Sequence, residues 1–274
     1  MNNRKVQAAL DYHNRTKHSL QSIRTSPHFL DWENQPLPFK IYSELEALPL
    51  PHQLTSATVP ALAAVSAPSD SGERLPDHHL LAEILHLSAG ITKRKSYPGG
   101  EILFRAAACT GALYHIDLYL VCGTLPDLEA GVYHFGPHDF ALRKLRSGDY
   151  RELLVRASGN EPAVASAPMV LVCASTYWRN AWKYQARAYR HCYWDNGTIL
   201  ANLLAAAGAR RVATKVILGF VDDAVTRLLG LDPLREGVLS LVPLGASAIP
   251  ASAPAIEPLT LETVPLSKRE IDYP

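Results

Sequence analysis

Cysteine is scarce in this 274-residue sequence: there are four, at positions 109, 122, 173 and 192. None belongs to a Cys-x-x-Cys pair and none has a histidine at zinc-finger spacing, so we expect buried, reduced thiols and no metal site. A chain of this length can bury a large core without disulfide bonds. Reduced thiols are typical of a cytoplasmic protein.

An excess of charge of either sign is also missing. Lysine and arginine number 27, aspartate and glutamate 26, and the formal net charge is +1. This balance argues against binding to nucleic acids or to anionic membranes. The N-terminus has no apolar signal core, and the longest apolar run, Ile199 to Ala209, is too short to cross a bilayer. We expect a cytoplasmic protein with no nucleic-acid and no membrane partner.

Familiar nucleotide-binding and catalytic motifs do not occur. The sequence has no Gly-x-Gly-x-x-Gly, no Walker loop and no Gly-x-Ser-x-Gly. This argues against a Rossmann dinucleotide site, a P-loop and an α/β-hydrolase nucleophile. Predicted helices and strands are mixed without strict alternation, which favours the α+β class over a doubly wound sheet.

Composition divides the chain into four parts. They are an N-terminal polar and aromatic arm (1–47), a linker rich in Pro, Ala and Ser (48–76), a folded domain (77–245) and an extended, proline-rich tail (246–274). The arm and the tail fold poorly on themselves, so we expect them to wrap a surface, with Trp32 and Phe39 as anchors in the arm.

Hydrophobic periodicity and turn residues predict the elements. Asp77 is the predicted N-cap residue of a helix that ends near Ser88. The other predicted helices span residues 4–13, 101–108, 149–157, 180–207 with a break near 194–197, and 222–229. The predicted strands span residues 115–122, 132–135, 168–174, 212–219 and 238–244.

A run of small residues precedes one predicted strand. Residues 105–112 read Arg-Ala-Ala-Ala-Cys-Thr-Gly-Ala. Small side chains let a backbone approach a flat ligand, and Gly111 can adopt unusual dihedral angles. In the strand that follows, Ile116 faces one side of the sheet and Asp117 and Tyr119 face the other. The run is a candidate ligand-binding loop, and an ordinary turn is the alternative.

A second candidate region gathers cations and aromatic rings between residues 178 and 191. Lys183 and Arg187 are four residues apart and share a helix face, with Tyr184 beside them. A lysine close to another cation loses its proton more readily, and a tyrosine can take part in the same proton transfer. The alternative is an amphipathic helix whose charges face water and whose rings pack inward.

The small-residue run resembles a motif of SagB-type (ThcOx/McbC-like) dehydrogenases of the FMN-dependent nitroreductase superfamily, Arg-x-x-Pro-Ser-Ala-Gly-Ala-Leu-Tyr-Pro-x-Glu-x-Tyr. The matching residues are Arg105, Gly111, Ala112, Leu113, Tyr114 and Tyr119. Asp117 replaces the family's Glu. The chain departs from the motif where Ala108, Cys109 and His115 replace Pro, Ser and Pro.

Other segments resemble further motifs of the same family. In the second region the matching residues are Lys183, Tyr184, Arg187, Tyr189, Arg190, Asp195, Gly197, Asn202 and Ala205, with Thr198 in place of a histidine. A closing pattern is matched at residues 219–222, 228–232 and 241–245. The arm resembles the opening of tandem members, in which two nitroreductase-like halves share one polypeptide. This chain would correspond to the N-terminal half.

The resemblance implies a nitroreductase-like α+β fold, with a central, mainly antiparallel sheet flanked by helices and with extended terminal arms. It implies FMN as cofactor and hydride transfer between the flavin and a small heterocyclic or peptide-derived substrate. The catalytic candidates are Lys183 and Tyr184. The cofactor-binding candidates are Arg105, Cys109, Thr110, Gly111, Ala112, Arg187, Asn202 and Gly219. A homodimer, or a pseudo-dimer with a second nitroreductase-like half, is expected.

One absence leaves an alternative open. Nitroreductases bind the FMN phosphate with an Arg-Arg-Ser-x-Arg element upstream of the helix that Asp77 caps, whereas residues 48–76 contain one arginine, Arg74. Cations elsewhere are candidate substitutes for a dianionic phosphate, namely those at positions 93–95, 210–211, 215 and 268–269. The alternative function is a degenerate half without flavin that acts as a scaffold or partner subunit.

Overall fold

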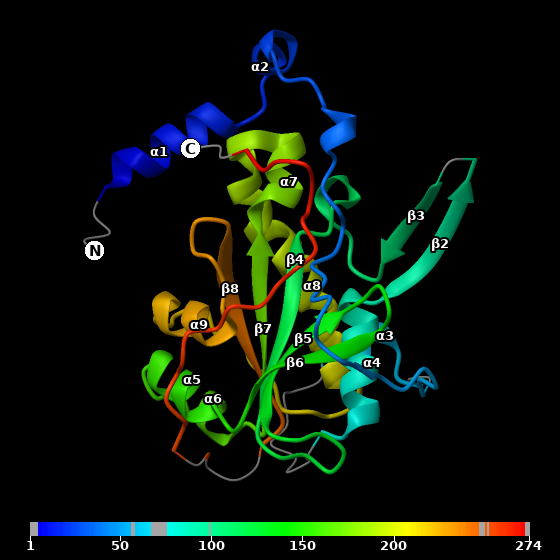
Figure 1. Ribbon diagram of the computed structural model, residues 1–274, viewed down its shortest axis with the longest axis vertical. Helices are drawn as coiled ribbons and strands as arrows, with labels where there is room; N and C mark the ends of the chain where they lie inside the picture. Colours follow the sequence, from blue (N-terminus) through cyan, green and yellow to red (C-terminus); the bar gives the residue numbers. More distant parts are fainter. Residues whose placement is uncertain are drawn as a thin grey trace.

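The computed structural model describes residues 5–55, 58–66, 76–98, 100–246, 250 and 252–271. Its centre is a six-stranded antiparallel sheet with the strand order β1-β6-β5-β4-β7-β8 (Figure 1). The strands are β1 (Ala47–Pro49), β4 (Ile116–Cys122), β5 (Gly131–Gly136), β6 (Ala141–Ser147), β7 (Met169–Thr176) and β8 (Glu236–Leu244). The predicted α+β class with a central antiparallel sheet is confirmed.

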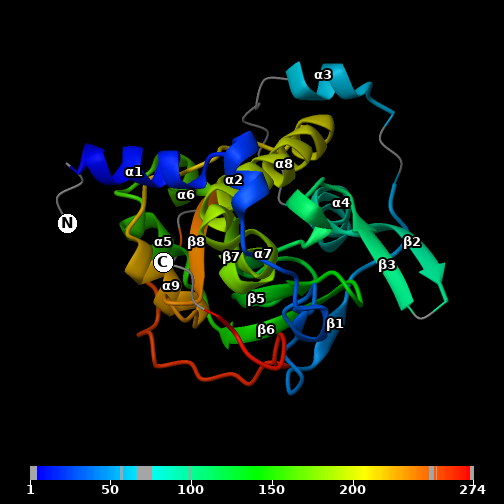
Figure 2. The same ribbon diagram turned by 90° about the horizontal axis from the view of Figure 1, so that it is seen from above.

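Helices cover both faces of the sheet, which is why β4 and β7 are buried throughout. The helices on one face are α4 (His78–Ala89) and α8 (Ala188–Ala209), and those on the other are α5 (Arg151–Ala157), α6 (Pro162–Ser166) and α9 (Asp222–Leu229) (Figure 2). Ile116 packs in the core under α4 and α8, and Tyr119 packs in the opposite core. The predicted alternation of this strand is confirmed.

Local capping chemistry defines the start of α4. The Asp77 carboxylate accepts a hydrogen bond of 2.8 Å from the Leu80 backbone N–H, as the sequence predicts for an N-cap. Helix α9 has the predicted bounds, 222 and 229. The first helix, α1 (Val6–Thr16), extends three residues beyond the predicted end, and Arg4 lies outside the described residues.

The arm and the tail lie side by side across the same side of the molecule (Figure 1). The arm contains α2 (Leu20–Thr25) and the short 3₁₀ turn η1 (Trp32–Asn34). Backbone hydrogen bonds join it to the tail, from Leu37 N to Leu266 O at 2.8 Å and from Val264 N to Ile41 O at 2.9 Å.

Both aromatic anchors of the arm contact the chain's own domain. Phe39 is buried, with its ring 5.1 Å from the Arg105 guanidinium. Trp32 is largely exposed, but its ring meets that of Trp182 edge-on at 5.4 Å. The arm therefore wraps this domain, and through Phe39 it contacts Arg105 at the start of the candidate loop.

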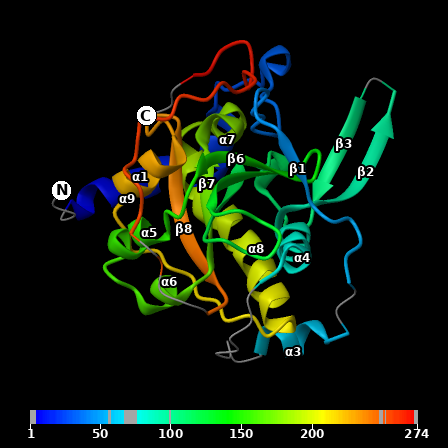
Figure 3. The same ribbon diagram turned by 60° about the horizontal axis from the view of Figure 1, so that its bottom comes forward.

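The linker is partly structured. It includes the end of β1 and the helix α3 (Ala61–Ser66), which packs against α8 (Figure 3). Residues 56–57 and 67–75, and with them the arginine at position 74, lie outside the described residues.

The predicted helix over residues 101–108 is wrong. These residues contain β3 (Gly100–Arg105), which pairs antiparallel with β2 (Ile91–Tyr97) in a hairpin that projects from the body (Figure 1). Proline and glycine between the two segments favour a turn, and pairing with β2 overrides the helical propensity of 101–108.

The long helix predicted over residues 180–207 is broken at a different place from the predicted 194–197. The break comes at Gln185, whose φ is +49°, between α7 (Tyr177–Tyr184) and the 3₁₀ turn η3 (Gln185–Arg187) that precedes α8. Helix α8 continues through Gly197, because one glycine lowers helix propensity without stopping a long helix.

The predicted strand over residues 212–219 is reduced to two isolated bridges, Thr214 to Leu244 and Ile217 to Leu241. The segment lies along the edge strand β8 without forming a continuous ladder. Strand β6 was not predicted from the sequence. It contains Arg143, Lys144 and Arg146, so its residues do not alternate between apolar and polar, although most of them are buried.

Candidate functional site

The loop between β3 and β4 is fastened to α8 by one carboxylate. Asp195 Oδ2 accepts a hydrogen bond from the Thr110 backbone N–H at 2.9 Å, and its Oδ1 accepts one from Thr110 Oγ1 at 2.7 Å. Burial raises the pKa of Asp195, but hydrogen bonds from His115, Cys109 and Thr110 outweigh it, and the net pKa lies below the ordinary value. Asp195 is therefore an ionised anchor for the loop.

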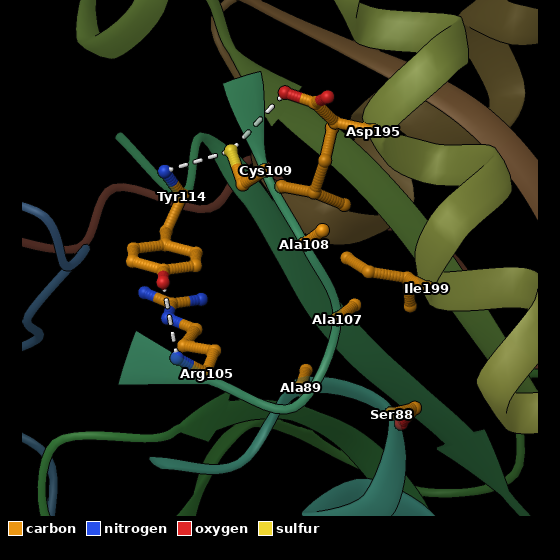
Figure 4. Close-up of a pocket in the computed structure, with 10 residues that line it drawn as sticks. Ser88, Ala89, Arg105, Ala107, Ala108, Cys109, Tyr114, Asp195 and Ile199 are labelled. Atoms are coloured by element: carbon orange, nitrogen blue, oxygen red, sulfur yellow. Dashed lines mark hydrogen bonds between the residues drawn. The ribbon is translucent and has the colours of Figure 1, made fainter. Parts of the chain in front are cut away.

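Two departures from the family motif, Cys109 and His115, meet at this carboxylate. Figure 4 shows the contact between Cys109 and Asp195. Cys109 Sγ lies 3.1 Å from Asp195 Oδ2. His115 Nε2 lies 2.9 Å from the same oxygen, and its Nδ1 lies 2.8 Å from Ser175 Oγ. Burial, with the nearby Asp195 charge, raises the pKa of Cys109 to about 12. Burial lowers the pKa of His115 despite Asp195, so the thiol is protonated and the imidazole neutral at pH 7.

The loop backbone takes left-handed dihedral angles at three residues. Gly111, Ala112 and Tyr114 have φ of +69°, +55° and +47°, and the side chains of Ala108 and Ala112 are exposed. Positive φ at non-glycine residues is costly and concentrates at functional sites. A small, exposed, rigid surface is thus presented at the end of the sheet.

The Tyr184 ring lies against Gly111. A Cβ at this position would come within 2.8 Å of Tyr184 Oη. The ring also packs edge-on against His191 at 4.7 Å, and the Lys183 ammonium lies 5.6 Å from its centre. Burial, with Cys109 and the Asp195 carboxylate nearby, raises the pKa of Tyr184, so its hydroxyl stays protonated.

Arg105 connects the loop to the arm. Its guanidinium lies 5.1 Å from the rings of both Phe39 and Tyr114 and donates to the Pro38 carbonyl at 2.6 Å. Its Nε is buried without a hydrogen-bond partner. Burial, with the neighbouring Arg179, lowers its pKa to about 10, which still leaves it charged at pH 7.

A buried ion pair beneath the loop was missed by the sequence analysis. Arg179, on α7, pairs with Asp117 of β4, and it donates to the Tyr114 carbonyl at 2.9 Å. Burial raises the pKa of Asp117, but Arg179 and the other cations nearby bring it below its ordinary value. An acidic residue on the inner face of a predicted buried strand was the available signal.

Comparison with known proteins identifies the fold family. Residues 74–246 match the model of the nitroreductase family. The chain belongs to the nitroreductase family.

The related proteins differ in length from this chain. It is 24% identical to protein MJ1384 of Methanocaldococcus jannaschii over 60% of this chain and 78% of that protein. It is 30% identical to the trifolitoxin-processing protein TfxB of Rhizobium leguminosarum bv. trifolii over 53% of this chain. A nitroreductase structure from Anabaena variabilis superposes with a TM-score of 0.71 and 31% identity over 86% of this chain. The chain spans 40% of TfxB and 45% of the Anabaena protein.

The structure of the Escherichia coli microcin synthetase complex McbBCD has a similar fold. One of its chains superposes with a TM-score of 0.55 and 20% identity, over 87% of this chain and 91% of that one. At this identity the likeness concerns the fold.

Members of the nitroreductase family generally bind FMN, so the loop can be tested for its fit to a flavin. The cavity that Arg105, Cys109 and Asp195 help to line has a volume of about 10 Å³, whereas ligand pockets measure about 300–1,000 Å³. A flavin ring therefore does not fit inside it. The outer surface of the loop is exposed at Ala108, Gly111 and Ala112, so a flavin ring would have to lie against that surface.

Four of the eight cations considered as phosphate ligands have carboxylate partners. Their pairs are Arg94 with Glu101 at 3.4 Å, Arg210 with Glu83 at 2.7 Å, Lys215 with Glu161 at 2.8 Å and Lys268 with Glu33 at 3.3 Å. In contrast, Arg187 and Arg190 pair with no carboxylate in the described part of the chain. Arg187 donates to the Thr16 carbonyl and Arg190 to Thr16 Oγ1, and the Nε atom of each is buried without a partner.

The remaining two candidates lie apart from the loop surface. Asn202 is on α8, about two turns beyond Asp195, and is half-buried. Gly219 lies between Ile217 and Phe220, which pack in the core on the α9 face of the sheet, opposite α8. The structure thus brings the loop residues, Lys183 and Tyr184 together and leaves Gly219 outside this group.

The described residues of this family member also lack a membrane-spanning element: no helix among them is both long enough and apolar enough to cross a bilayer.

Proposed function

We propose that the chain is an FMN-dependent oxidoreductase of the SagB/nitroreductase type. It transfers a hydride between flavin and a small heterocyclic or peptide-derived substrate, and bound FMN would supply the redox chemistry. The observation that carries the proposal is the strained, exposed loop at Gly111 and Ala112, fixed by Asp195 and adjacent to Tyr184. A surface of small residues suits a planar cofactor, and the general binding of FMN by members of the family supports flavin as that cofactor.

Lys183 and Tyr184 are proposed to serve proton transfer. Tyr184 keeps its proton at neutral pH, since burial raises its pKa, and its hydroxyl is held beside the loop surface by the contact with Gly111. Lys183 extends from the same helix end and places a cation near the ring of Tyr184. A donor and a cation at one edge of a cofactor surface can move and stabilise a proton on substrate.

Arg187 and Arg190 are proposed to bind the FMN phosphate in place of the family's upstream arginines. They follow Tyr184 along the chain and pair with no carboxylate in the described residues, so their charge is available to an anion. Burial and the neighbouring Arg190 lower the pKa of Arg187 without removing its charge at pH 7. Two adjacent guanidinium groups are suited to a dianion.

A two-fold assembly is proposed to complete the site. The loop surface is open on one side, and Tyr189, Tyr193 and Trp194 on α8 are half-exposed. The Anabaena protein is about twice as long as the part that this chain covers, which supports a second nitroreductase-like half or a second copy. Light scattering of the FMN-loaded protein should give the mass of two chains. A monomer with full flavin occupancy would overturn this assembly.

The trifolitoxin-processing role in the name of TfxB supports a peptide-derived substrate. The activity test therefore uses an azoline-containing peptide and FMN-loaded protein. The expected product has lost two hydrogens per ring, detected by mass spectrometry, while the flavin absorbance bleaches in the absence of oxygen. Bound FMN with no mass change and no bleaching would reject this substrate class. Reduction of a nitroaromatic probe by the same preparation, with a reduced nicotinamide added as the electron donor, would then favour a reductase.

The second candidate is a flavin-less scaffold half. It is favoured by the cations that already have carboxylate partners and by Cys109, whose thiol is engaged with Asp195 where the family has serine. This candidate predicts a folded protein that binds no FMN. Flavin titration separates the two functions directly.

A further inference from the structure

We propose that Cys109, His115 and Asp195 form a binding site for one divalent transition-metal ion of the zinc class. The three side chains come from the loop, the residue before β4 and the middle of α8. Their ligand atoms all lie within 4.8 Å of one another. The sequence predicts no metal site, because no cysteine belongs to a Cys-x-x-Cys pair or has a histidine at zinc-finger spacing. The fold brings together His115 and Asp195, which are 80 residues apart.

The spacing of the ligand atoms suits a tetrahedral ion. Sγ of Cys109 and Nε2 of His115 lie 3.1 and 2.9 Å from the same Asp195 oxygen. Zinc bonds of about 2.0–2.3 Å keep tetrahedral ligands about 3.3–3.6 Å apart. The two distances to Asp195 would have to open by only a few tenths of an ångström, and Cys109 Sγ and His115 Nε2 lie within 4.8 Å of each other. Rotation of the cysteine and carboxylate side chains can bring all three ligands to tetrahedral spacing.

A second set of hydrogen bonds already orients each ligand. Ser175 Oγ lies 2.8 Å from Nδ1 of His115, so that nitrogen can hold the ring proton and leave Nε2 free for a metal. Thr110 Oγ1 donates to Oδ1 of Asp195, and the Tyr114 N–H donates to Cys109 Sγ at 3.1 Å. Such outer contacts accompany metal-binding histidines and carboxylates and strengthen binding.

The cluster also has room for a fourth ligand. Cys109 and Asp195 help to line the cavity of about 10 Å³ beside the loop, a volume of roughly one water molecule. Three protein ligands and one water are a common zinc arrangement. Sulfur, nitrogen and a single carboxylate oxygen exclude magnesium and calcium as preferred ions, because these take oxygen ligands.

The ion would join the loop, β4 and α8 at one point, and it would act without FMN. Failure of the metal site and failure of the flavin site are therefore distinguishable, since metal is measured in flavin-free protein.

The test is a cobalt titration of untagged, chelator-treated, reduced protein, followed by zinc competition and metal analysis. We expect one ion per chain and a near-ultraviolet cysteinate-to-cobalt charge-transfer band. Cys109→Ser should abolish that band, and His115→Ala should weaken binding about tenfold or more. Cys173→Ala removes a buried thiol outside the cluster. It should leave the charge-transfer band and the cobalt affinity unchanged. Circular dichroism of the Cys109→Ser protein confirms that it is folded.

Absence of a stoichiometric ion would overturn the proposal. So would a cobalt complex without the cysteinate band, or one that Cys109→Ser leaves intact, since the ion would then be held elsewhere, for example by histidines of the arm.

Discussion

Gly111 lies so close to Tyr184 that a single added methyl group would meet the tyrosine hydroxyl at 2.8 Å. The position combines this contact with a φ of +69°. Glycine is needed there for two independent reasons, space and backbone conformation. The contact also couples the loop from β3 to the end of α7, which are the two regions that the sequence singled out.

Gly111→Ala should destabilise the protein by about 1–3 kcal/mol, because alanine strains the left-handed backbone and pushes Tyr184 away. Gly197→Ala is the matched control. A Cβ at Gly197 meets nothing within 4 Å, and the residue is inside α8, so this change should stabilise by about 0.5–1 kcal/mol. Urea unfolding measures both. Equal effects of the two substitutions would contradict the packing described for the loop.

Lys183→Ala and Tyr184→Phe should each lower turnover about 10²-fold or more while flavin content stays at the level of the unaltered protein, since general acid–base groups contribute about 10²–10⁴-fold. Lys215→Ala is the control, because that lysine is exposed and pairs with Glu161 away from the loop. Turnover with the azoline peptide and flavin absorbance are measured together. Unchanged turnover in both variants would make the end of α7 purely structural.

Replacing Arg187 and Arg190 by glutamine should weaken FMN binding about tenfold or more, because each charge-assisted hydrogen bond is worth about 1.5–3 kcal/mol. Riboflavin, which lacks the phosphate, should bind the variant and the unaltered protein equally. Fluorescence quenching of the two flavins measures this difference. An equal loss for riboflavin would show that the arginines support the fold and not the phosphate.

The buried pair of Asp117 and Arg179 should make stability fall in acid. The folded-state pKa of Asp117 lies below its ordinary value of 3.8, so its contribution is present above pH 3.8 and is lost as the pH falls through the lowered folded-state pKa. Asp117→Asn should cost about 3–5 kcal/mol at neutral pH, since it leaves Arg179 buried without its counterion. The free energy of unfolding of the variant should also fall less steeply in acid than that of the unaltered protein. Urea unfolding of both proteins between pH 2 and 7 tests this expectation. It would be contradicted if the free energy of unfolding changed with pH in the same way in the variant and in the unaltered protein.

The sequence predicted the elements whose signals are local. Asp77 caps α4, and the alternation from Ile116 to Cys122 places the right side chains on each face of β4. It failed where pairing between segments decides the structure. The β2–β3 hairpin replaced a predicted helix because Ile102 and Phe104 belong to a strand whose partner lies across a turn.

The candidate site, too, has a part that could be predicted from the sequence and a part that could not. Resemblance to family motifs located the loop and the Lys183–Tyr184 pair, which the structure brings together through Gly111. The meeting of Cys109 and His115 on Asp195 could not be predicted, because the third residue is far along the chain and reaches the loop only through the packing of α8. The Asp117–Arg179 pair was hidden for the same reason.

The most direct test of the proposed function is the visible absorbance spectrum of the purified protein after incubation with FMN and gel filtration. The account predicts a flavin spectrum that co-elutes with the protein, close to one FMN per chain, and a higher melting temperature with flavin than without. A folded protein that elutes colourless and gains no thermal stability from FMN would contradict the oxidoreductase and favour the scaffold half.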